Sequence, residues 1–88
     1  MRNNFLQLSY CDGKFFAGYL YLDDPGAKSA RSREEEAGLV VDFGVDGHPI
    51  GIEITSPASF SLAALNRVLA SLNLAPATPT DVGPLVAV

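Results

Sequence analysis

The fold of this chain is decided by one stretch of sequence, LVVDFGVDGHPIGIEI at residues 39–54. At its centre, Asp46-Gly47 is the dipeptide typical of a two-residue type I′ turn between antiparallel strands. We therefore place Val45 opposite His48, a register that brings six apolar side chains onto one face. The pairs are Phe43 with Ile50, Val41 with Ile52, and Leu39 with Ile54. The stretch predicts a β-hairpin with one buried and one mostly polar face.

A second hairpin is predicted upstream, around Asp12-Gly13. Both flanks, residues 5–10 and 15–22, are rich in the aromatic and aliphatic residues that favour strands. This register pairs Tyr10 with Phe15 and Leu8 with Ala17, across a loop of two residues or more. Residues 28–36 have no apolar period and are predicted to be either a short polar edge strand or a loop.

An amphipathic helix follows the second hairpin. Leucines at 62, 65, 69 and 72 recur at spacings of three and four residues. Ser59 or Ser61 is expected to cap the start of this helix, and Asn73 to mark its end. The chain is thus predicted to be α+β, with an antiparallel sheet of about four strands packed on one C-terminal helix. Residues 1–74 are expected to form a single domain, and residues 75–88 an extended, proline-containing tail.

Composition narrows the class of protein. The net charge of −4 argues against a nucleic-acid partner, because phosphate binding needs clustered Lys and Arg. A single cysteine, Cys11, excludes an intramolecular disulfide and fits a reducing compartment. The first residues lack a secretory layout and no apolar run is long enough to cross a bilayer, so a cytoplasmic protein without membrane contact is expected. Apolar residues make up 48% of a chain of only 88 residues. Because so short a chain buries only part of its surface, this content favours a homodimer.

The segment from Gly38 to Thr55 resembles the signature of a bacterial family, domain of unknown function 2283. Its most specific part is Gly51-Ile52-Glu53-Ile54, preceded by Val41-Asp42-Phe43 and, upstream, by the strand Tyr19–Leu22. The resemblance covers residues 5–56 and departs from the family pattern at Pro49, at residues 24–36 and beyond residue 56. It implies no enzyme activity. It implies a small accessory protein, antitoxin-like in the members encoded beside putative toxins, that acts on another small protein.

No catalytic, metal or cofactor site is predicted, since no phosphate-binding loop, dinucleotide-binding glycine pattern or zinc-protease helix occurs. Asp42 and Glu53 are expected to be diagonal neighbours on a solvated sheet face, while turn geometry accounts for Asp46 and His48. The leading hypothesis is a non-enzymatic interaction or regulatory module. The alternative is a metal-dependent or hydrolytic enzyme assembled at a subunit interface from Asp42, Glu53 and His48. The predicted interaction surface comprises Tyr19, Tyr21, Asn66, Arg67, Ala70, Leu85 and Val86.

Overall fold

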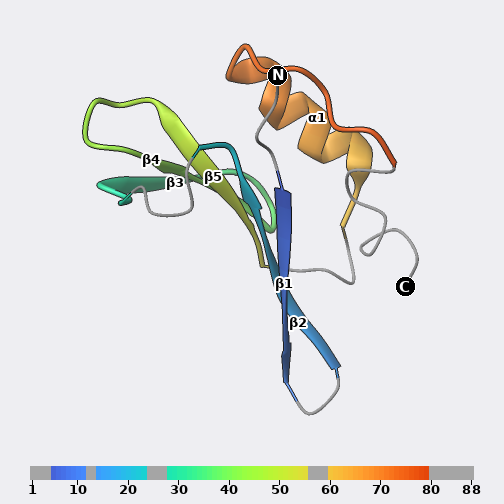
Figure 1. Cartoon of the computed structure of the whole chain (residues 1–88). Helices are drawn as coiled ribbons and strands as arrows, with labels where there is room; N and C mark the ends of the chain where they lie inside the picture. Colours follow the sequence, from blue (N-terminus) through green and yellow to red (C-terminus); the bar gives the residue numbers. More distant parts are fainter. Residues whose placement is uncertain (1–4, 12–13, 24–27, 56–59, 80–88) are drawn as a thin grey trace.

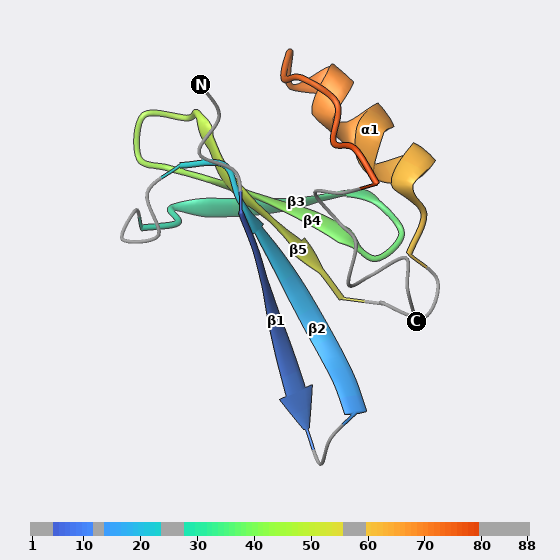
Figure 2. The same cartoon turned by 45° about the vertical axis from the view of Figure 1, so that its right-hand side comes forward.

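The computed structural model describes residues 5–11, 14–23, 28–55 and 60–79, which form one antiparallel sheet and one helix (Figures 1 and 2). The strands are β1 (Phe5–Cys11), β2 (Lys14–Tyr21), β3 (Arg31–Glu36), β4 (Leu39–Phe43) and β5 (Pro49–Ile54), and the helix is α1 (Leu62–Ser71). Their spatial order in the sheet is β1-β2-β5-β4-β3. The α+β class is confirmed, whereas the count of about four strands is wrong: there are five. The additional strand is β3, so the edge-strand alternative holds for this segment.

The β4–β5 hairpin has the predicted register over most of its length but a different turn. Val41 pairs with Ile52 and Leu39 with Ile54, as expected. The β4–β5 loop spans residues 44–48, and its turn has three residues between Gly44 and His48, because Gly44 N–H donates to the His48 carbonyl at 2.8 Å and Gly47 N–H donates to the Gly44 carbonyl at 2.9 Å. This is a tight turn followed by a glycine with positive φ, here +89° at Gly47, and not a type I′ turn.

A bulge reconciles the longer loop with the predicted pairing. Phe43 pairs with Pro49 instead of Ile50, and the register then shifts by one between Asp42 and Phe43. The shift cancels the extra loop residue. The apolar residues further along both strands therefore stay on one face, as burial requires.

The core lies between one face of the sheet and α1. Leu20, Val41, Ile52 and Ile54 from the three central strands are at most 1% exposed, and they join Leu65, Val68 and Leu69 of the helix in one apolar cluster. Among the described side chains, Val45 in the β4–β5 loop is the one large apolar residue that is fully exposed, at 90%. The other face of the sheet, called the open face below, is covered by no helix among the described residues.

The boundaries of α1 follow from its capping residues. Ser61 is the N-cap, and its hydroxyl accepts a hydrogen bond from the Ala64 N–H at 3.2 Å. The alternative cap, Ser59, lies outside the described residues. Asn73 has φ of +61°, and Leu74 N–H returns to the Leu69 carbonyl at 2.9 Å, which is the usual C-terminal arrangement with a left-handed residue. The helix therefore ends where Asn73 predicted.

The N-terminal hairpin is longer than the sheet behind it. β2 pairs with β5 only from Gly18 to Tyr21, yet it continues back to Lys14 alongside β1. The residues beyond the sheet, Ser9–Cys11 and Lys14–Ala17, are called the arm below; the arm projects away from the other strands in both views (Figures 1 and 2). Tyr10 pairs with Phe15 as predicted, but Leu8 pairs with Gly18 instead of Ala17 because a bulge lies between Ser9 and Tyr10. The turn residues Asp12-Gly13 lie outside the described residues.

Candidate functional site

The open face carries two rows of side chains that cross the sheet. One row runs from Tyr21 over Gly51 and Asp42 to Ser32. The neighbouring row consists of Gln7, Tyr19, Glu53, Val40 and Glu34. Because alternate residues of a strand point to the same face, all of these positions face away from α1.

Asp42 is the centre of the polar contacts on this face. It is only 6% exposed, and its carboxylate accepts hydrogen bonds from the Tyr19 hydroxyl at 2.9 Å and from the Ser32 hydroxyl at 2.5 Å. Burial, followed by the hydrogen bond to Asp42, raises the pKa of Tyr19 well above its ordinary value. Three strands, β2, β4 and β3, are thereby tied together by side chains as well as by backbone pairing.

Glu53 is the diagonal neighbour of Asp42, as the sequence predicted. A side-chain hydrogen bond with Asp42 is the main cause that raises the pKa of Glu53, followed by burial and by the negative charge of Asp42. Two carboxyl groups so close together hold a proton more readily than either would alone. The pKa of Glu53 therefore lies above the ordinary value of a glutamate side chain.

The lack of a side chain at Gly51 leaves room for Tyr19 to contact Asp42. A Cβ atom at position 51 would lie 2.1 Å from the Tyr19 hydroxyl oxygen and 2.3 Å from Cζ of the same ring. The Tyr19 ring thus lies directly across the backbone of Gly51 to reach the next strand but one. Only a residue without a side chain leaves that path open.

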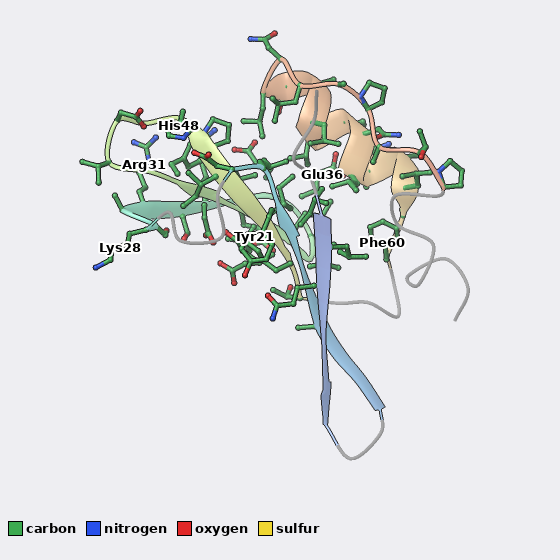
Figure 3. The ribbon with its side chains drawn as sticks, in the orientation of Figure 1. Tyr21, Lys28, Arg31, Glu36, His48 and Phe60 are labelled. Carbon is green, nitrogen blue, oxygen red and sulfur yellow. The ribbon has the colours of Figure 1, made fainter. Side chains whose placement is uncertain are left out.

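Tyr21 completes the aromatic part of the open face. Its ring meets that of Tyr19 edge to face, with centroids 4.7 Å apart, and its hydroxyl donates to Oε1 of Gln7 at 2.8 Å. Tyr21 lies on the side of the sheet away from α1, whereas Glu36 lies close to the helix (Figure 3). The two tyrosines predicted as part of an interaction surface are therefore adjacent and held in place by polar partners.

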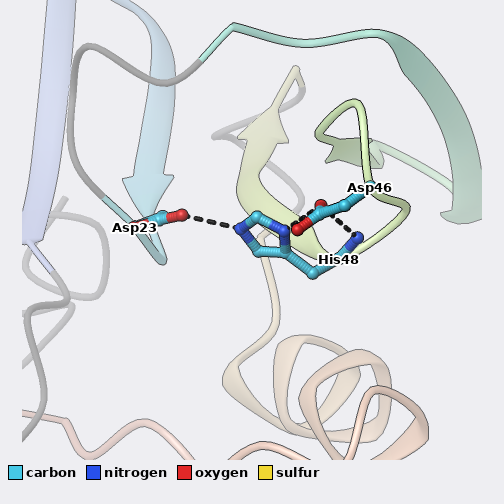
Figure 4. A network of polar contacts seen from close by, with 3 residues as sticks. All are labelled: Asp23, Asp46 and His48. Atoms are coloured by element: carbon cyan, nitrogen blue, oxygen red, sulfur yellow. Dashed lines mark hydrogen bonds and ion pairs between the residues drawn. The ribbon is translucent and has the colours of Figure 1, made fainter.

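His48 lies at a different place, in the β4–β5 loop (Figure 4). Its Nε2 is 2.7 Å from Oδ2 of Asp23, and its Nδ1 is hydrogen-bonded to Asp46. The hydrogen bonds to Asp23 and then to Asp46 are the main causes that raise the pKa of His48. The imidazole therefore bridges the end of β2 and the loop. Its hydrogen bonds go to these two aspartates and not to Asp42 or Glu53, with which the alternative hypothesis had grouped it.

The helical residues of the predicted surface have partners within the chain. Asn66 exchanges two hydrogen bonds with the backbone of Ala77, at 3.2 and 2.7 Å, and Ala77 is buried. Arg67 binds Glu36 through two nitrogens, at 2.8 and 3.0 Å. Ala70 is exposed. Leu85 and Val86 lie outside the described residues, so their part in a surface stays a prediction.

The arm was not among the residues singled out from the sequence. The signal in the sequence is the length of the strands: residues 15–22 form a longer segment than residues 50–54, with which they pair. In the part of the chain that the structure describes, no group of three His, Cys, Asp or Glu side chains is placed to hold a metal ion. Among the same residues, no helix combines the length and apolar character needed to cross a membrane.

Comparison with known families matches residues 17–56 to the family described as "Protein of unknown function (DUF2283)". No curated protein and no solved structure matches the chain. The matched segment contains Tyr19, Asp42, Gly51 and Glu53, and it leaves out the arm except for Ala17. Residues 17–56 of this chain are therefore similar to the family of proteins of unknown function DUF2283.

Proposed function

We propose that this protein is a non-enzymatic protein-interaction module and that the arm is its contact element. The observation that carries the proposal is the projection of the arm beyond the rest of the sheet (Figure 2). An isolated two-stranded hairpin is only marginally stable in water, and exposed strand edges readily pair with another chain. A hairpin that extends beyond the other strands of its sheet is therefore suited to binding another molecule.

The residue types of the arm support the same proposal. It contains Tyr10, Phe15 and Phe16 within seven described residues, and aromatic residues are enriched in the cores of protein interfaces. The opposite edge of the sheet differs: in β3 every residue except Ser32 is charged, which discourages strand pairing there. The two ends of the sheet thus differ in chemistry, and only the arm end is suited to contact.

A regulatory role on another small protein is the finer part of the proposal. It rests on the family resemblance, which implies a small accessory protein, and on the two tyrosines of the open face. Tyr19 and Tyr21 are fixed by hydrogen bonds, so a partner that contacted them would lose little side-chain entropy. The open face beside the arm is the surface on which we expect such a partner to extend its contact.

The proposal is tested by comparing what intact protein and arm variants retain from cells. Phe15→Lys and Phe16→Lys place a charge in the arm, and Val45→Lys places the same charge on an exposed residue at another loop. A protein partner retained by the unchanged chain and by Val45→Lys, but lost by both arm variants, supports the proposal. Identical retention by all four proteins overturns the role of the arm as contact element.

A further inference from the structure

The backbone of β2 offers an unpaired edge of defined length. β5 occupies that edge from Gly18 to Tyr21 and ends at Ile54, opposite Gly18. Over Lys14–Ala17, the same edge has no partner strand among the described residues. The strip is four residues long, about 13 Å at the usual rise of a strand, and it begins where β5 stops.

A strand placed there would lie in line with β5 and antiparallel to β2. β2 itself satisfies this requirement, because two copies of one strand related by a twofold axis are always antiparallel. With the axis between Phe15 and Phe16, Lys14 of one copy would lie opposite Ala17 of the other. Each free edge would then be paired by the other, so the strip is complementary to itself.

We infer that the arm of this protein binds the arm of a second copy, by antiparallel pairing of the two β2 segments Lys14–Ala17. The inference rests on the proposed function and names the partner of that surface. It also gives the surplus of apolar residues in the sequence a place in the assembly.

The size of the surface is compatible with a dimer. Three aromatic side chains and one leucine, Leu8, belong to each arm and its root. Aromatic residues bury about 150–250 Å² each when covered, so three such residues correspond to roughly 600 Å² for each chain at full coverage. This is close to the roughly 800 Å² per partner of a standard interface, and the root of β1 beside the arm would add to it. Area alone therefore does not exclude a stable pair.

The first measurement is the solution mass of the full chain by light scattering between about 1 and 100 μM. We expect twice the chain mass, and a dissociation constant raised on the order of tenfold or more by Phe15→Lys or Phe16→Lys. Val45→Lys is the matched control and should leave the dimer unchanged. NMR spectra of the backbone amides of residues 39–54 show whether each variant keeps the fold of the β4–β5 hairpin.

The second measurement tests the register by disulfide formation between chains, in a background with Cys11→Ser. A mixture of Lys14→Cys and Ala17→Cys chains should cross-link, because directly opposed strand residues lie within disulfide range. Ala17→Cys alone should not, because residue 17 and its counterpart would be about 10 Å apart along the strands. Ser29→Cys mixed with Lys14→Cys is a further control that should stay unlinked.

The outcomes separate this inference from the proposed function. A dimer that depends on the arm, with the 14–17 cross-link, supports both. A single-chain mass at every concentration overturns the second-copy inference, while retention of a different protein that depends on the arm would still uphold the proposed function. A dimer that survives both arm variants, or that cross-links in another register, overturns the pairing stated here.

Discussion

Replacing Gly51 by alanine would test the path of Tyr19 across the centre of the sheet. The added methyl group would lie 2.1–2.4 Å from three atoms of the Tyr19 side chain, far inside contact distance. The sheet backbone at Gly51 is paired on both sides, with Tyr21 and with Asp42. We therefore expect the Tyr19 side chain to move and the backbone to stay.

The free energy of unfolding should fall by about 2 kcal/mol. Displacing Tyr19 breaks its hydrogen bond to the Asp42 carboxylate, and bonds to charged groups contribute about 1.5–3 kcal/mol. The lost edge-to-face contact with Tyr21 adds about 0.5–1.5 kcal/mol. The lower backbone entropy of alanine in the unfolded chain offsets about 0.5–1 kcal/mol. For a domain of this size, the midpoint temperature should drop by about 8–16 °C.

The assay is a double-mutant cycle measured by thermal or urea unfolding. Gly51→Ala is made in the unchanged chain and again in a Tyr19→Ala background, where the ring is absent. In that background the alanine should be neutral or slightly stabilising, giving a coupling energy near the whole cost of the single change. An equal loss of stability in both backgrounds would refute the reasoning, since the obstruction would then lie elsewhere.

Three further perturbations test single contacts. His48 is the one histidine of the chain, and its pKa is raised in the folded state. Its two aspartate contacts therefore stabilise the fold fully below about pH 6.5, and this stabilisation is lost as the pH rises through the folded-state pKa. Proton NMR should show a His48 pKa above about 6.5, and His48→Gln should remove this pH dependence of stability. Glu53→Gln should stabilise the protein at pH 7, because the hydrogen bond with Asp42, burial and the Asp42 charge all raise the pKa of Glu53 and so disfavour its charged form. A lower midpoint temperature than that of the unchanged chain would contradict this. Asn66→Ala should lower the free energy of unfolding by about 1–2 kcal/mol, because the two hydrogen bonds to the Ala77 backbone are lost. Urea unfolding would measure this as a lower midpoint with an unchanged dependence of the unfolding free energy on urea concentration.

The central hairpin and the helix were predictable because local chemistry and the apolar pattern agree. The pairs Val41–Ile52 and Leu39–Ile54 came from alternation alone, and the end of the helix came from Asn73. The three-residue turn was not predictable, because Asp-Gly also suits a turn in which only the glycine has positive φ. Its extra residue is compensated by a bulge that leaves no trace in the apolar pattern.

The open face shows a similar limit. The diagonal placement of Asp42 and Glu53 followed from strand periodicity, but the reach of Tyr19 to Asp42 depends on the neighbouring strand order, β2 beside β5. That order joins segments far apart in the sequence and has no local signal. The use of Asn66 and Arg67 within the chain was likewise hidden, since the partners Ala77 and Glu36 come from other elements.

The unequal edges of the sheet decide how large an assembly this chain would build. A sheet that accepted strands at both ends would grow without limit, each added copy exposing a fresh edge to the next. Here one end is β3, in which five residues of six are charged, and charged side chains on an edge strand discourage the addition of a further strand. The pairing proposed above is closed in itself, because each β2 segment covers the other and neither is left free for a third copy.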